Sequence, residues 1–92
     1  MEEQKSLADS YFAFHRTVYE PKLLDKKTKE LIALAVGSAL QCSDCIDSHA
    51  QKAKAAGANA EEIKEAVYIA AAVRAGATLT YGKKAWEEKK EG

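Results

Sequence analysis

The sequence is poor in the residues that build β-sheets and long loops. Of its 92 residues, 8% are aromatic and only one is proline, and no stretch sustains an alternation of apolar and polar residues. Strands normally show that alternation and are enriched in aromatic and β-branched side chains. The chain is instead 47% hydrophobic and rich in alanine, which suits closely packed helices. We therefore predict an all-α protein of about four to five helices, forming a single domain over residues 1–92.

An excess of either charge and a long apolar run are missing as well. The 14 basic residues balance the 14 acidic ones, and no basic block could neutralise a row of phosphates. No segment approaches the roughly 18 consecutive apolar residues of a membrane-spanning helix. The charged start MEEQKSLADS also lacks the apolar run of a signal peptide. We therefore expect a cytoplasmic protein with neither a nucleic acid nor a membrane as its partner.

Two helices are expected before the cysteines. The first covers about residues 3–19, and Pro21 separates it from a second, which begins after the N-cap Asp25 and continues to Gln41. In the first helix, apolar residues at three- and four-residue spacing predict a packing face: Leu7, Tyr11, Phe14 and Val18, widened by Phe12 and Tyr19. The residues predicted to point inward from the second helix are Leu31, Ile32, Ala35, Val36 and Ala39. Because a glycine weakens a helix, Gly37 predicts a close helix crossing.

The second half of the chain predicts two or three more helices. One begins near Ser43 and ends at Gly57, which has the position of a left-handed cap. Asn59 and Glu62 form a predicted capping box for the next, which is either one long helix or two joined at Gly76. Its segment YIAAAVRAGA is small and apolar nearly all round, which indicates burial against a neighbouring subunit. The closing WEEKKEG predicts a solvated, frayed end.

Cysteine occurs only twice, at Cys42 and Cys45 within QCSDCIDSH, residues 41–49. In a reducing cytoplasm such a pair is more often catalytic or metal-binding than a permanent disulfide. On a helix that includes all three, Cys42, Cys45 and His49 share one face. If the helix starts near Ser43, Cys45 lies in its first turn, where unpaired N–H groups favour a thiolate, and His49 can accept the thiol proton. Cys45 is therefore the candidate nucleophile, and Cys42 the candidate thiol that closes a disulfide with its oxidised product.

Three interpretations of these residues remain open at this point. The one we favour is a redox centre, because two thiols and a base converge at a helix start. A zinc site could use Cys42, Cys45 and His49, but it needs a fourth ligand, and His15 is the only other histidine. Two inert, buried thiols are the third interpretation.

Glu30 is a further candidate. On its helix it aligns with Leu34, Gly37 and Gln41, so the carboxylate points along a strip that ends beside the cysteines. There it could relay protons to His49. Since Gln41 lies about 16 Å further along the helix axis, this requires the third helix to fold back alongside the second, and a bridging water could be needed. The alternative is an ordinary surface glutamate in the charged run DKKTKE.

The stretch LLDKKTKELIALAVGSALQCSDCIDSHAQKAKAAGANAEEIKEAV resembles the core of the AhpD-like alkylhydroperoxidases, within the carboxymuconolactone decarboxylase family. The resemblance covers residues 23–67 and continues more weakly to residue 86. It includes a glutamate twelve residues before the first cysteine, the Cys-x-x-Cys-x-x-x-His motif, and the segment GA..EEI.EA. The decarboxylase branch is less similar, because its members generally lack the cysteine pair.

The resemblance implies an all-α fold whose thiols reduce hydroperoxides. The implied catalytic residues are Cys45 as peroxidatic cysteine, Cys42 as resolving cysteine, and His49 with Glu30 as proton relay. It also implies a lipoyl-bearing or thioredoxin-like dithiol reductant and a homotrimer or homohexamer. No cofactor or metal is expected. One departure concerns Asp44, because peroxidase members tend to have a histidine there, and a carboxylate would disfavour a neighbouring thiolate.

We therefore expect a thiol-dependent peroxidase or disulfide oxidoreductase. The alternative is a non-enzymatic, oligomeric zinc-binding or interaction protein.

Overall fold

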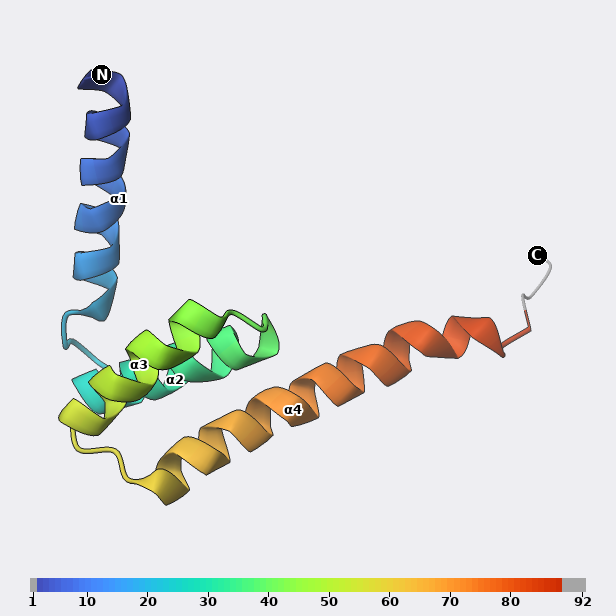
Figure 1. The fold of residues 1–92 in the computed structure, drawn as a ribbon. Helices are drawn as coiled ribbons and strands as arrows, with labels where there is room; N and C mark the ends of the chain where they lie inside the picture. Colours follow the sequence, from blue (N-terminus) through green and yellow to red (C-terminus); the bar gives the residue numbers. More distant parts are fainter. Residues whose placement is uncertain (1, 89–92) are drawn as a thin grey trace.

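The computed structural model describes residues 2–88, with side chains from residue 5 onward, and it is all-α throughout this range (Figure 1). The helices are α1 (Glu2–Tyr19), α2 (Lys26–Ala39), α3 (Ser43–Ala55) and α4 (Ala60–Gly82), followed by the 3₁₀ turn η1 (Lys83–Ala85). The predicted fold class and the starts of α2, α3 and α4 are confirmed. Part of the predicted frayed end, residues 89–92, lies outside the described range.

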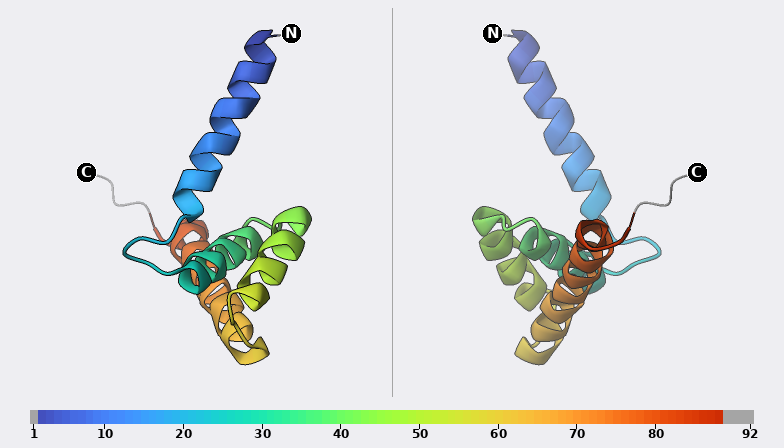
Figure 2. Two further views of the ribbon diagram at one scale, coloured as in Figure 1. Left: turned by 90° about the vertical axis from the view of Figure 1, so that its left-hand side faces the viewer. Right: turned by 90° about the vertical axis from the view of Figure 1, so that its right-hand side faces the viewer.

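The second helix is the centre of the fold. α3 folds back along one side of α2, and α4 packs against another (Figures 1 and 2). The apolar side chains buried in this three-helix body are few, and most are small: Leu34, Ala53, Ala58 and Ala70. Because alanines allow helices to approach closely, the body is held together by short contacts around a single large side chain, Leu34.

Local hydrogen bonds set where the helices begin and end. The Asp25 carboxylate accepts from the Thr28 N–H at 2.8 Å and caps α2. At the start of α4, Asn59 and Glu62 form the predicted capping box, with reciprocal bonds of 2.8 and 3.0 Å. Gly57 follows α3 with φ +100°, a left-handed conformation that glycine adopts without strain. Each N-cap contributes roughly 1 kcal/mol to stability.

The turn between α2 and α3 depends on Cys42. Its N–H donates to the Gly37 carbonyl at 2.9 Å, and the Gln41 N–H donates to the Ser38 carbonyl at 3.1 Å. These two bonds form a Schellman ending for α2, with Gln41 in the left-handed position at φ 57°. Cys42 is also the N-cap of α3. One residue therefore ends α2 and begins α3.

The apolar stripe of α1 does not pack within the chain. The exposed fractions of Leu7, Phe14 and Val18 are 72%, 67% and 44%. Figures 1 and 2 show why: α1 projects away from the three-helix body and meets it only at its C-terminal end. The prediction of an apolar face was right about the pattern, but within the described residues only its C-terminal end, at Tyr19, packs against another helix.

The predicted inward face of α2 was wrong for Ile32 and Val36, whereas Leu31, Ala35 and Ala39 are half-buried. Ile32 and Val36 are 48% and 53% exposed, whereas the buried residues are Glu30, Leu34 and Gly37. The reason is that α3 packs on the Glu30 strip, while α4 covers only part of the apolar stripe. Gly37 does mark the close crossing that was expected.

The fourth helix is continuous, so the break considered at Gly76 is absent and the helix ends at Gly82. Only Ala70 is buried along it, and the segment YIAAAVRAGA is largely exposed in the single chain, with Ile69 and Val73 60% and 65% accessible. The radius of gyration is 18.1 Å, against about 12 Å for a compact domain of this length. The chain is open rather than globular. Among the described helices, none combines the length and apolar character needed to cross a membrane.

Candidate redox site

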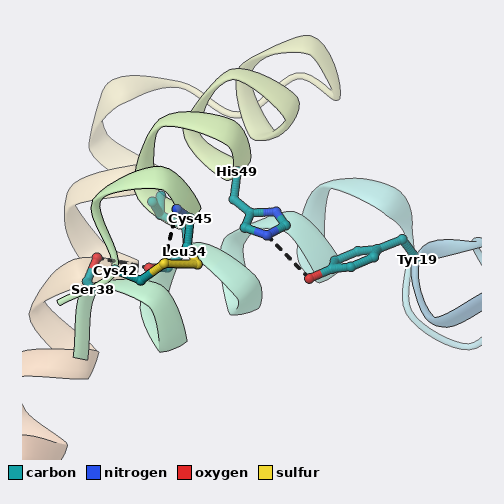
Figure 3. Close-up of a disulfide and its surroundings, with 6 residues drawn as sticks. All are labelled: Tyr19, Leu34, Ser38, Cys42, Cys45 and His49. Carbon is teal, nitrogen blue, oxygen red and sulfur yellow. Dashed lines mark hydrogen bonds between the residues drawn. A yellow bond between two sulfur atoms is a disulfide. The ribbon is translucent and has the colours of Figure 1, made fainter. Parts of the chain in front are cut away.

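The two cysteines form a disulfide at the start of α3. Cys42 and Cys45 are bonded through their sulfurs, with their Cα atoms 5.2 Å apart (Figure 3). The Cys42 sulfur accepts the Cys45 N–H at 3.3 Å, as an N-cap side chain does. Cys45 lies in the first turn of α3, as predicted. The sulfur at the capping position, however, belongs to Cys42, so the helix N-terminus acts on Cys42 most directly.

Because Gly37 has no side chain, the turn that contains Cys45 can lie close to the backbone of α2. A Cβ built on Gly37 would lie 2.9 Å from the Cβ of Cys45, closer than real Cβ contacts permit. Any larger residue would displace Cys45. The glycine therefore sets the distance between the disulfide and α2.

His49 and Glu30 form a buried pair beside the disulfide. His49 Nδ1 lies 2.8 Å from Glu30 Oε2, and the residues are 9% and 0% exposed. The contact is direct, so the bridging water considered above is not needed. Glu30 is no surface glutamate, because α3 folds back over it. Lys26, one turn earlier on α2, places Nζ 3.0 Å from Glu30 Oε1 as a partly exposed ion-pair partner.

The charges around Glu30 keep it ionised. Burial by itself raises the pKa of Glu30, but the contacts with His49 and Lys26 outweigh it and hold the pKa below its usual value. An ionised Glu30 can only accept, so His49 donates from Nδ1 and leaves Nε2 free as an acceptor. Within the described residues, Glu30 Oε1 accepts no hydrogen bond of good geometry. The histidine is therefore oriented as a base.

Tyr19 is a site residue that the sequence analysis missed. Its hydroxyl lies 3.5 Å from His49 Nε2, and its ring stacks on the imidazole with 5.3 Å between centroids (Figure 3). By its spacing in the sequence, Tyr19 only widens the apolar stripe of α1. Its position before the Pro21 turn was the one available sign, but no spacing rule connects residue 19 to residue 49.

An apolar cavity of about 470 Å³ opens beside these groups. Cys45, His49 and Tyr19 line it, together with apolar residues of α1 and α2 that include Val18, Ile32, Val36 and Leu40. Cys42 is not among the lining residues. A small molecule in the cavity would therefore meet Cys45 first.

The described residues contain no group of three His, Cys, Asp or Glu side chains placed to hold a metal ion. Both sulfurs are engaged in the disulfide, and His49 is paired with Glu30. His15, the fourth ligand considered above, instead packs its ring on Tyr19 at 4.7 Å.

Comparison with known proteins places the chain among its relatives. The model of the carboxymuconolactone decarboxylase family matches residues 6–88. The chain belongs to this family.

Three similar proteins illustrate the relationship. An uncharacterized protein of the cox locus of Paracoccus denitrificans is 42% identical over 80 residues, which are 87% of this chain and 72% of that protein. An alkyl hydroperoxide reductase AhpD of Streptomyces griseus is 42% identical over 57 residues, 61% of this chain and 32% of that protein. A crystal structure from Methanobacterium thermoautotrophicum superposes with a TM-score of 0.85 at 31% identity, covering 94% of this chain and 97% of that one. The recognised family and the fold are thus confirmed.

Proposed function

We propose that the protein is a thiol-dependent peroxidase that reduces hydroperoxides through the Cys42–Cys45 pair. The observation that carries the proposal is the juxtaposition of a disulfide with a buried, ionised carboxylate and an oriented histidine at an apolar cavity. Family membership and the similarity to AhpD point to the same antioxidant class of activity. Because the chain spans about a third of that AhpD, the activity of the whole relative does not transfer automatically.

The reaction starts from the dithiol. His49 Nε2 takes the proton of the Cys45 thiol, and Glu30 stabilises the imidazolium that results. The thiolate attacks the distal oxygen of the hydroperoxide, the O–O bond breaks, and the departing alkoxide takes up one proton and leaves as an alcohol. Cys45 becomes a sulfenic acid. The Cys42 thiol then attacks the Cys45 sulfur, the disulfide forms and water is released.

The disulfide must be reduced by a dithiol from outside the chain, of the lipoyl-bearing or thioredoxin-like kind. The incoming thiolate should attack Cys45, which lines the cavity, and expel Cys42. The capping position stabilises negative charge on the Cys42 sulfur, which makes it the better leaving group. Two electrons pass from the dithiol to the peroxide in each cycle.

The test of the proposal is peroxide-dependent oxidation of an added dithiol, such as dihydrolipoamide. Cys45→Ser should abolish turnover. Cys42→Ser should accumulate a sulfenic acid that a dimedone probe traps, or a mixed disulfide with the dithiol on Cys45. Ser43→Ala, between the two cysteines and exposed, is the matched control and should keep the wild-type rate. Retained turnover in Cys45→Ser would contradict the proposal.

The active form is proposed to be a homo-oligomer, a trimer or hexamer. The support is the open shape of the chain and the apolar side chains exposed along α1 and α4, among them Leu7, Phe14, Val73 and Leu79. Monomeric proteins rarely expose so many large apolar residues side by side.

Light scattering at micromolar concentration should return a multiple of the 10.0 kDa chain mass. The double variant Leu7→Glu/Phe14→Glu should shift the mass towards that of one chain, while Lys5→Glu, on the opposite side of α1, should not. A single-chain mass for the wild-type protein would contradict the assembly.

A further inference from the structure

We propose that Tyr19 is the proton donor to the leaving oxygen of the peroxide, passing on the proton that His49 receives from Cys45. The inference rests on the proposed peroxidase function and adds one catalytic group to it. It is drawn from the position of the Tyr19 hydroxyl, which lies at His49 Nε2 and on the same cavity as Cys45.

Two groups can use the Nε2 lone pair of His49, the Tyr19 hydroxyl and the Cys45 thiol. With Nδ1–H held by Glu30, a neutral His49 offers only the Nε2 lone pair. In the disulfide form Tyr19 is the donor that faces it, at the long distance of 3.5 Å. In the dithiol form the proposed proton transfer from Cys45 uses the same lone pair, and Cys45, His49 and Tyr19 all line one cavity. Once Nε2 has taken the thiol proton, the imidazolium can donate to the Tyr19 oxygen.

The tyrosine is held in place from several sides. The centre of its ring lies 4.7 Å from that of His15 and 5.3 Å from that of His49, and Lys26 Nζ is 5.5 Å from the ring centre. Lys29 Nζ holds the backbone on both sides, at 2.7 Å from the Val18 carbonyl and 2.6 Å from the Glu20 carbonyl. A residue of the otherwise unpacked α1 is thus fixed over the site by contacts from α2 and α3.

The surroundings of Tyr19 keep its hydroxyl protonated. Partial burial, the nearby carboxylate of Glu30 and the Tyr11 hydroxyl raise the pKa of Tyr19, so the phenol remains protonated. It acts by relay, since Tyr19 releases its own proton to the alkoxide as it accepts one from the His49 imidazolium. The proton balance closes: the proton that leaves the Cys45 thiol arrives on the alcohol product, and His49 and Tyr19 return to their starting states.

The distinguishing experiment varies the leaving group. Tyr19→Phe keeps the aromatic ring but removes the hydroxyl. Stopped-flow oxidation of the reduced protein is compared with tert-butyl hydroperoxide, which expels a basic alkoxide, and with peracetic acid, which expels a carboxylate that needs no proton. Loss of general acid catalysis should slow the first reaction about 100-fold and the second by no more than about threefold. Tyr81→Phe, exposed near the C-terminal end of α4 and outside the segment YIAAAVRAGA, should change neither rate.

A purely structural role of Tyr19 would slow both oxidants alike. Equal losses on both, or no loss on either, would therefore overturn the inference while leaving the peroxidase proposal intact. If the wild-type thiols react with neither oxidant, the proposed function itself fails, and the inference fails with it. Alkylation of Cys45 by iodoacetamide, which expels iodide, should proceed at the wild-type rate in Tyr19→Phe and shows that the nucleophile is unaltered.

Discussion

The α2–α3 pair and the two outer helices, α1 and α4, differ in the side chains that they bury. Between α2 and α3 the chain buries a carboxylate and an imidazole, joins two sulfurs and brings backbones together at Gly37. α1 and the second half of α4 expose leucine, phenylalanine and valine instead. Two ionisable side chains, Glu30 and His49, are buried while many large apolar side chains are exposed, which is unusual for a globular domain. The difference shows that α2 and α3 pack closely around the candidate site, whereas the described residues leave apolar side chains of α1 and α4 uncovered.

The largest effect should come from matched leucine truncations. Leu34, 2% exposed on α2, should lose about 2–5 kcal/mol of unfolding free energy on change to alanine, because it is the one large apolar residue of the core. Leu79, 66% exposed on α4, should lose about 0.5 kcal/mol or less under conditions where the protein is monomeric. Urea unfolding of both variants measures the contrast. Equal losses of unfolding free energy in the monomer would show that Leu79 is packed as tightly as Leu34, which contradicts its exposure.

Two glycine substitutions sharpen the same contrast. Gly37→Ala brings a Cβ into collision with Cys45 and should destabilise the protein by about 1–3 kcal/mol in spite of the better helix propensity of alanine. It should also slow disulfide formation, since Cys45 must move. Gly76→Ala meets nothing within 4 Å and should stabilise α4 by up to about 1 kcal/mol. Thermal unfolding measures the stability of both variants, and thiol oxidation is also followed in Gly37→Ala. A Gly37→Ala variant as stable as the wild type would contradict the close approach of α2 to Cys45.

The free energy of unfolding should vary with pH as Glu30 gains or loses its proton. Its pKa is lowered in the folded protein, so the ionised form stabilises the fold above the unfolded value of about 4.5. That contribution should be lost as pH falls below 4.5 and through the lower folded pKa. Glu30→Gln should cost roughly 1–3 kcal/mol at pH 7, the range for a buried hydrogen bond to a charged group, and should flatten the acid limb.

Glu65→Gln, on the exposed surface of α4, is the control for that experiment and should leave the acid limb unchanged. An unaltered pH profile in Glu30→Gln would mean that another carboxyl dominates acid unfolding.

The smallest effect concerns the turn that joins the two helices of the site. Gln41 adopts φ 57°, a conformation that favours glycine. Gln41→Gly should therefore stabilise the protein by up to about 1 kcal/mol, visible as a rise of a few degrees in the melting temperature. Gln51→Gly, inside α3, is the opposite control and should destabilise. A lower melting temperature for Gln41→Gly would indicate that its side chain contributes more than its backbone strain removes.

Much of this architecture was accessible from local sequence rules. Short-range hydrogen bonding and backbone preference predict helix ends at Asp25, Asn59 and Gly57, and the structure has them in those roles. The strip through Glu30, Leu34 and Gly37 was also found by helical periodicity. The same periodicity failed for Ile32 and Val36, because it identifies an apolar face without saying what covers that face.

Local sequence rules are enough to predict the helices, their caps and the position of Cys45 one turn before His49, because these depend on interactions within a few residues along the chain. Helix packing, which no local rule covers, brings Glu30 directly against His49 and brings Tyr19 to the imidazole from thirty residues away. It also decided that α1 stands apart from the rest of the chain. Contacts between distant segments follow from how whole helices pack, and no local pattern encodes the angle at which one helix leaves another.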